Sequence, residues 1–249
     1  MKKIYLAALT LAMTACVSND DLNPVDNYGY IDVNVSNDPV MVTRAGEPNW
    51  QLSATKNGEA YTGIAYGTNK VPEGTYVISA KSHASIDVAN TTNTYGEPYF
   101  EGESAPTQIS AGDSKDATID CSKAKNSKLT LVNALNSSVF TNVKLNATSL
   151  NRQLSLSNQN PSAFYSIETS VNYNISYNYN GSQTETVIQN NGQDYTITIA
   201  EAAKDYQIKL TSTDNGNINV TVTYNNEFGK VESEEFTFDA ATGDIANQQ

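Results

Sequence analysis

Residues 171–179 read VNYNISYNY and alternate strictly between a large apolar or aromatic side chain and a polar one. A period of two is typical of a β-strand that buries one face, because successive side chains of a strand point to opposite sides of the sheet. Asn180 and Gly181 follow at once, and this dipeptide is favoured in the two-residue turns of tight hairpins. The stretch therefore predicts a long strand whose odd-numbered side chains lie in the core.

The same alternation recurs along most of the chain, and helical spacing of apolar residues is nearly absent. Apolar side chains share one strand face in the segments 31–35, 76–80, 129–131, 143–147, 195–199, 206–210, 218–224 and 236–238. Short strands with turn residues between them are typical of antiparallel β-sandwiches. The sequence thus predicts an all-β protein built from antiparallel sheets.

A short polar stretch divides this pattern. Residues 122–127 read SKAKNS and interrupt the alternation. We predict a linker there, between an N-terminal β-sandwich over residues 28–121 and a C-terminal one over residues 128–238. Each piece has the ordinary size of a sandwich domain. Residues 239–249 lack a strand pattern, and we predict that they form a flexible tail.

The N-terminus has the features of a bacterial lipoprotein signal. Two lysines precede an apolar run over residues 4–13, which is too short to span a bilayer but is typical of a signal-peptide core. Small residues followed by Cys16 end the run and resemble a lipobox. We predict a signal peptide over residues 1–15, acylation of Cys16 and a lipidated tether over residues 16–27. The alternative is plain secretion with Cys16 left in the mature chain.

The residues after Cys16 indicate a location. Residues 17–21 read VSNDD, and this acidic stretch resembles the export signal that sends lipoproteins of Bacteroidota to the outer face of the outer membrane. We therefore predict an outer-membrane lipoprotein that is exposed on the cell surface. A solvated tether without signal content is the alternative.

Charge and composition exclude several classes of partner. The formal net charge of −12 repels nucleic-acid phosphates, so we predict no nucleic-acid partner. His83 is the sole histidine, and Cys121 is the sole cysteine besides Cys16, which is too few ligands for a usual zinc site. Cys121 shares a strand face with apolar residues, and we predict that it is a buried core residue.

Catalytic patterns are equally sparse. Ser82 or Ser85 can be combined with His83 and Asp87 into a triad, but no nucleophile-elbow spacing supports it. Acidic clusters later in the chain could in principle supply the two carboxylates of a glycosidase, but such a pair must face across a cleft. We interpret these clusters as solvated strand faces. We therefore predict a protein without enzymatic activity, cofactor or metal.

Aromatic residues in loop-like stretches are compatible with a binding role. Sugar-binding sandwiches stack pyranose rings on exposed aromatic side chains, and loops often carry such sites. We predict glycan contact at Trp50, Tyr95, Tyr99 and Phe100. The alternative is that these side chains are loop anchors that pack into the end of a sandwich.

A series of short motifs carries a family resemblance. The motifs are GYIDV (29–33), TRA (43–45), VPEGTY (71–76), PYFEG (98–102) and ISAG (109–112). Their order and spacing are similar to an uncharacterised family of Bacteroidota surface lipoproteins, domain-of-unknown-function family 4493, and to the wider fimbrillin-like group. The resemblance implies two tandem transthyretin-like, Greek-key sandwiches and no established enzymatic activity.

The resemblance also implies a role for Arg44. In fimbrillin-like pilins a trypsin-like protease cuts after such an arginine and releases the first strand, and the opened groove accepts a strand from the next subunit. This chain has the required order of lipid anchor, first strand over residues 29–35, and Arg44-Ala45. We predict processing between Arg44 and Ala45. The alternative is an ordinary loop arginine and a first strand that stays in place.

Together these features predict a non-enzymatic, lipid-anchored cell-surface protein for adhesion or fimbria-like assembly. Its expected partners are the membrane, through the lipid, and a protein subunit or second copy added by strand pairing. The alternative is a glycan-binding surface lipoprotein of an outer-membrane uptake system. A coat protein without a specific ligand is a third possibility.

Overall fold

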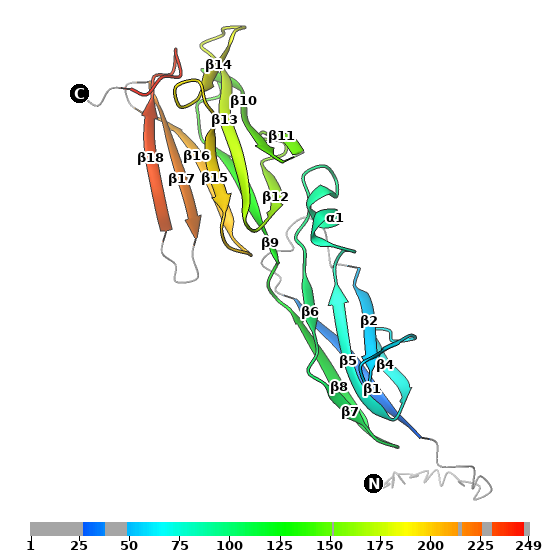
Figure 1. Ribbon diagram of the computed structural model, residues 1–249. Helices are drawn as coiled ribbons and strands as arrows, with labels where there is room; N and C mark the ends of the chain where they lie inside the picture. The colour runs from blue at the N-terminus through cyan, green and yellow to red at the C-terminus, as the bar shows by residue number, and fades with distance from the viewer. Residues whose placement is uncertain (1–26, 38–48, 151, 214–215, 226–230, 247–249) are drawn as a thin grey trace, which may run out of the picture.

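The computed structural model describes residues 27–37, 49–150, 152–213, 216–225 and 231–246. These residues form β-strands almost throughout, with one short helix, so the all-β prediction is confirmed. Figure 1 shows an elongated molecule of two lobes, the first formed by β1 to β8 and α1, the second by β9 to β18. Each lobe has its own hydrophobic core.

The first lobe packs two sheets around the first core. One is a three-stranded sheet in the order β4 (Gly67–Pro72), β1 (Tyr28–Asn37), β8 (Ser114–Cys121). The other has the order β3 (Glu59–Tyr61), β2 (Gln51–Lys56), β5 (Gly74–Lys81), with β6 (Glu101–Glu103) and β7 (Thr107–Ile109) both paired to β5.

The second lobe repeats this arrangement with longer strands. One sheet has the order β12 (Ser162–Ser166), β9 (Asn126–Asn133), β16 (Asp205–Ser212), β17 (Ile218–Asn225), β18 (Val231–Phe238). The other has the order β11 (Arg152–Leu156), β10 (Phe140–Ser149), β13 (Thr169–Tyr179), with β14 (Glu185–Ile188) and β15 (Tyr195–Ile199) both paired to β13.

The burial of the strands follows the alternation in the sequence. In β13 the odd-numbered residues 171–177 are buried, as predicted. Cys121 is buried as well, which confirms its predicted place in the core. The sheets are antiparallel except for two pairs, β1 with β8 and β9 with β16, which are parallel. Parallel neighbours need a long crossover connection, so each of these pairs joins strands that lie far apart in the sequence.

The helix α1 (Ile86–Thr91) was not expected from the sequence. Ser85 begins it, since the Ser85 side chain accepts a hydrogen bond from the Val88 amide at 3.3 Å. Six residues are too few to show helical periodicity. The helix lies at the end of the first lobe that faces the second lobe (Figure 1).

The C-terminal segment after β18 is folded. The Tyr177 hydroxyl donates to the buried Ala240 carbonyl at 3.1 Å, and the Ala246 amide donates to the Thr237 carbonyl at 2.9 Å. The Asp239 carboxylate accepts from the Thr242 and Ala241 amides, and these hydrogen bonds lower its pKa. The predicted flexible tail is therefore wrong for residues 239–246, because this turn closes the second core.

The predicted linker over residues 122–127 is also wrong in part. Asn126 and Ser127 are fully buried and begin β9, and Ala124 is buried in the first core. Both polar side chains are buried because each finds hydrogen-bond partners. The passage between the lobes is thus a packed junction.

Candidate functional site

The strand β1 is the central strand of the three-stranded sheet in the first lobe. It pairs with β4 in the antiparallel sense from Tyr28 to Val33, and with β8 in the parallel sense from Tyr30 to Asn37. β1 alone separates β4 from β8 in this sheet. We call the space that β1 occupies the β1 slot, since withdrawal of β1 would leave one edge of β4 and one edge of β8 unpaired.

The side chains of β1 show what the slot accepts. Ile31 and Val33 are fully buried and belong to the first core, whereas Tyr30 on the opposite face is exposed. At Gly29 an added Cβ atom would lie 2.5 Å from Ile109 Cγ2 and 2.8 Å from the Ser110 carbonyl oxygen. A strand in this slot therefore needs a glycine at the position of Gly29 and apolar side chains of about the size of isoleucine and valine at the positions of Ile31 and Val33.

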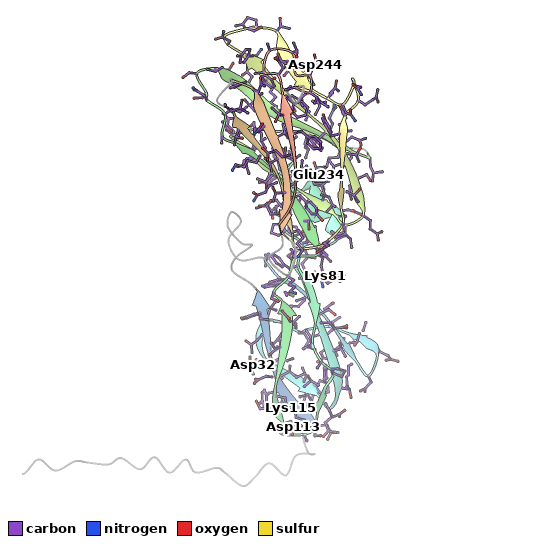
Figure 2. The ribbon with its side chains drawn as sticks, turned by 90° about the vertical axis from the view of Figure 1, so that its left-hand side faces the viewer. Asp32, Lys81, Asp113, Lys115, Glu234 and Asp244 are labelled. Atoms are coloured by element: carbon purple, nitrogen blue, oxygen red, sulfur yellow. The ribbon has the colours of Figure 1, made fainter. Side chains whose placement is uncertain are left out.

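The start of β1 is held by the turn between β7 and β8. The Tyr30 amide donates to the Asp113 carbonyl at 2.7 Å, and the Gly112 amide donates to the Tyr28 carbonyl at 2.9 Å. The Asp113 carboxylate accepts from the Ser110 amide and contacts Lys115 at 3.1 Å, and these contacts lower its pKa. Figure 2 places Asp113 and Lys115 at the end of the first lobe remote from the second. Main-chain bonds thus fix the register of β1 at its first residues.

The predicted functional residues at the N-terminus lie outside the described residues. Cys16, Arg44 and Ala45 belong to segments that the structure does not describe. Acylation of Cys16 and processing after Arg44 therefore stay predictions.

The four aromatic residues predicted to contact a glycan do not form an exposed cleft. Tyr99 and Phe100 are 4% and 1% exposed, so the prediction is wrong for these two. Trp50 packs edge-on against Phe100, with 6.3 Å between the ring centroids. Tyr95 packs against the second core, and its hydroxyl donates to the Ser155 carbonyl at 3.3 Å. Burial of apolar surface holds these rings in place, which agrees with the alternative that they are loop anchors.

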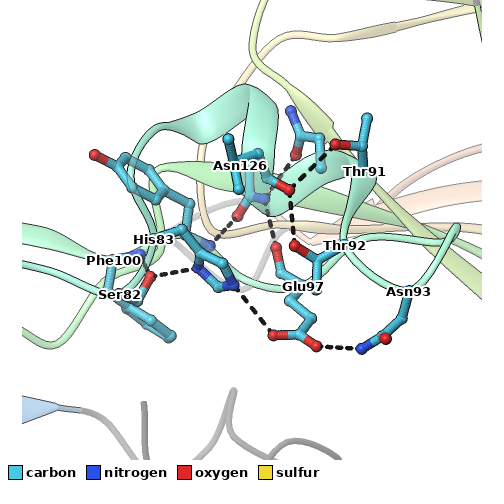
Figure 3. A network of polar contacts seen from close by, with 11 residues as sticks. Ser82, His83, Thr91, Thr92, Asn93, Glu97, Phe100 and Asn126 are labelled. Atoms are coloured by element: carbon cyan, nitrogen blue, oxygen red, sulfur yellow. Dashed lines mark hydrogen bonds and ion pairs between the residues drawn. The ribbon is translucent and has the colours of Figure 1, made fainter. Parts of the chain in front are cut away.

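A second candidate site is the junction between the lobes, where Asn126 is the centre of a hydrogen-bond network (Figure 3). Its Nδ2 donates to Asn90 Oδ1 at 2.8 Å and to the Glu97 carbonyl at 2.9 Å. Its Oδ1 accepts from the Tyr99 amide at 2.8 Å. Asn90 in turn donates to Ser166 Oγ of the second lobe at 2.8 Å. One buried amide therefore connects α1, the loop before β6 and the second lobe.

His83 lies beside this network in a short polar chain (Figure 3). Its Nδ1 lies 3.0 Å from Ser82 Oγ, and its Nε2 lies 3.1 Å from Glu97 Oε2. Glu97, and not Asp87, is thus the carboxylate beside the histidine. Ser82 is buried, and its hydroxyl oxygen accepts the Phe100 amide hydrogen at 2.9 Å. This contact gives the serine a structural role in holding the Phe100 backbone.

No group of three or more histidine, cysteine or acidic side chains that could hold a metal ion occurs among the described residues. Within the same part of the chain, no helix has the length and apolar character needed to cross a membrane.

No protein-family model matches the chain, and no curated protein matches its sequence. The resemblance to family 4493 therefore stays a prediction. Three solved structures are similar to this fold over most of its length. A fimbrial assembly protein from Parabacteroides distasonis is 9% identical, with a TM-score of 0.43, over 83% of this chain and 98% of that one.

The second is a candidate cell adhesion protein from Bacteroides uniformis, 8% identical with a TM-score of 0.42 over 86% of this chain and 98% of that one. The third is the tip fimbrial protein Mfa3 from Porphyromonas gingivalis, with a C-terminal truncation. It is 8% identical with a TM-score of 0.35 over 85% of this chain and 99% of that one.

Cys121 offers a direct probe of the β1 slot. It lies opposite Asn37 at the end of the β1–β8 pairing, and burial raises the pKa of its thiol to about 11. We expect the folded protein, residues 17–249, to leave Cys121 unmodified by a thiol reagent at pH 8, because the thiol is both buried and protonated. Mass spectrometry after a timed exposure measures the modified fraction, with urea-unfolded protein as the fully reactive control. Rapid modification of the folded protein would contradict the packing of β1 against β8.

Proposed function

We propose that this protein is a non-enzymatic, lipid-anchored cell-surface protein that acts in adhesion or fimbria-like assembly by exchanging the strand in the β1 slot. The observation that carries this proposal is the central position of β1, which brings buried side chains and hydrogen bonds to both of its neighbours. An empty slot would expose two strand edges and apolar pockets, and such a site is filled by adding a strand.

Cleavage after Arg44 has two consequences in this scheme. It separates the residues that carry the lipid from residues 45–249, and it leaves β1 attached to the rest of the protein by non-covalent contacts alone. An incoming strand then competes for the same hydrogen bonds and the same two apolar pockets. A copy that is not cleaved keeps its anchor and its own β1.

The incoming strand comes from a second copy or from another subunit. In this structure β18 is an edge strand that pairs with β17, and Phe238 is buried in the core of its own lobe. β18 is therefore not free to be donated while the second lobe stays folded as described. A donor strand must meet the glycine and apolar requirements of the slot.

Limited trypsin digestion of residues 17–249 tests the proposal. We expect cleavage after Arg44, loss of the fragment that contains β1, and larger species in size-exclusion chromatography. The variant Arg44→Gln should stay monomeric under the same conditions. Mass spectrometry identifies the cleavage site and shows whether the β1 fragment remains bound.

A disulfide lock provides the matched control. Asp32 of β1 and Thr68 of β4 are register partners with side chains in contact at 3.4 Å, so Asp32→Cys/Thr68→Cys can form a bridge across the two strands. The oxidised variant should be cut after Arg44 but remain monomeric, and a reductant should restore assembly. Resistance at Arg44, or a cut wild-type monomer that retains β1, would contradict strand exchange.

A further inference from the structure

A cleft with a volume of about 380 Å³ lies where α1 meets the second lobe. From the first lobe it is lined by Asp87, Asn90 and Thr91 of α1. From the second lobe, Leu150, Arg152 and Tyr165 are among the residues that line it. The volume is within the range of small-ligand sites, and such sites often lie between structural units.

Two opposite charges line this cleft without pairing with each other. The Arg152 guanidinium lies 5.1 Å from the centroid of the Tyr165 ring and donates to the Phe164 and Thr94 carbonyls, each at 2.6 Å. It has no carboxylate partner among the described residues, although burial of the side chain lowers its pKa. A guanidinium has five N–H groups, so these two bonds leave donors for a ligand.

Asp87 is the complementary group on the opposite lobe. Its carboxylate makes no hydrogen bond or ion pair with the part of the chain that the structure describes, and only its backbone carbonyl accepts, from Thr91. An arginine without a carboxylate partner in the described part of the chain is notable in a protein with a net charge of −12, where carboxylates are abundant. The cleft is therefore lined by one cation and one anion that have no ion-pair partner among the described residues.

One exposed aliphatic side chain, that of Leu150, lines the cleft beside its polar and charged groups. Leu150 lines the cleft, is 95% exposed and has a backbone φ of +43°, a left-handed conformation that a leucine rarely adopts. An exposed leucine beside polar groups offers a contact for an apolar ligand group, and strained backbone often occurs at functional positions.

We propose that this cleft binds a small zwitterion with an apolar side chain, namely an apolar amino acid or dipeptide. The ligand carboxylate pairs with Arg152, the ligand ammonium group pairs with Asp87, and the apolar side chain packs on Leu150. This inference does not rest on strand exchange in the β1 slot. The site needs both lobes, because Asp87 comes from the first and Arg152 from the second.

Isothermal titration calorimetry on residues 17–249 tests this site with leucine and with the dipeptide Leu-Leu as probes. Two comparison compounds each lack one charge: 4-methylpentanoate has no ammonium group, and 3-methylbutylamine has no carboxylate. We expect saturable binding of leucine or Leu-Leu, and about tenfold or more weaker binding of both comparison compounds, because each loses one charge-assisted contact.

Variants of the two charged residues assign the contacts. Asp87→Asn removes a carboxylate that lies in the first turn of α1 and makes no hydrogen bond or ion pair with the described residues, so the variant should fold normally. The variant should bind leucine about as weakly as the unsubstituted protein binds 4-methylpentanoate. Arg152→Gln should lose the preference for a carboxylate. Arg152 also donates a hydrogen bond to the Thr94 carbonyl across the junction. The melting temperature of the Arg152→Gln variant is therefore measured in parallel.

Three results would overturn the proposal. The first is no saturable binding of either probe at millimolar concentration. The second is an unchanged preference for leucine over 4-methylpentanoate in Asp87→Asn. The third is full affinity in a folded Arg152→Gln variant.

Discussion

A protein that consists of residues 45–249 is expected to lose the stable fold of its first lobe, and a synthetic peptide of residues 27–37 is expected to restore it. Ile31 and Val33 are fully buried in the first core, and each such side chain contributes about 1.5–3 kcal/mol through its burial. The truncation also leaves β4 and β8 without the strand that pairs with both. The combined loss is a large part of the roughly 5–15 kcal/mol that stabilises a typical domain.

Urea unfolding followed by near-ultraviolet circular dichroism measures this effect. The reactivity of Cys121 provides a second readout, since Cys121 pairs with the end of β1, its thiol is buried in the first core, and this core should open in the truncated protein. Added peptide should raise the unfolding midpoint in a concentration-dependent manner, because a ligand that binds only the folded state stabilises it by mass action.

Two altered peptides make the rescue specific. A peptide with Ile31→Asn and Val33→Asn cannot fill the apolar pockets, and a peptide with Gly29→Val places a side chain where Ile109 and the Ser110 carbonyl already lie. Neither should restore the first lobe. If residues 45–249 unfold with the same free energy as residues 17–249, the slot does not need its strand, and the proposed exchange has no driving force.

The second large effect is expected at the junction between the lobes. Asn126→Ala should lower the free energy of unfolding by about 3 kcal/mol or more, because a buried polar group without its partner costs about 1–3 kcal/mol. The substitution leaves three groups unpaired: the Tyr99 amide, Asn90 Oδ1 and the Glu97 carbonyl. We also expect the two lobes to unfold in separate transitions, since Asn90 would no longer be held toward Ser166.

Chemical denaturation with separate probes for the two lobes measures both outcomes. The matched control is Asn133→Ala on the same strand, where the Asn133 side chain donates to Asn158 in an exposed position and accepts from the partly buried Leu135 amide, both at 3.2 Å. This variant should lose about 1 kcal/mol of unfolding free energy, clearly less than Asn126→Ala, because water can replace the partner at the exposed contact. If both variants lose the same free energy of unfolding, the Asn126 network contributes no more to stability than a surface contact does.

Several elements of the fold were predictable from local patterns. The alternation in residues 171–179 predicted both β13 and the burial of Tyr173 and Tyr177. The helix α1 escaped prediction because it is a short capped helix of six residues, and the fold of residues 239–246 depends on contacts with Tyr177, far away in the sequence. The exposure of the aromatic residues predicted to contact a glycan was wrong for a related reason. A loop-like sequence does not reveal whether an aromatic ring packs inward.

By itself, the sequence determined the all-β class, the strands and their buried faces, and its first residues carry the pattern from which we predict a lipid anchor at Cys16. These are local properties, because strand alternation and a signal peptide are each encoded in neighbouring residues. Only the tertiary structure decided that β1 lies between β4 and β8, that Asn126 joins the lobes, and that Asp87 and Arg152 line one cleft. These residues meet through packing across long sequence separations, for which the chain carries no local pattern.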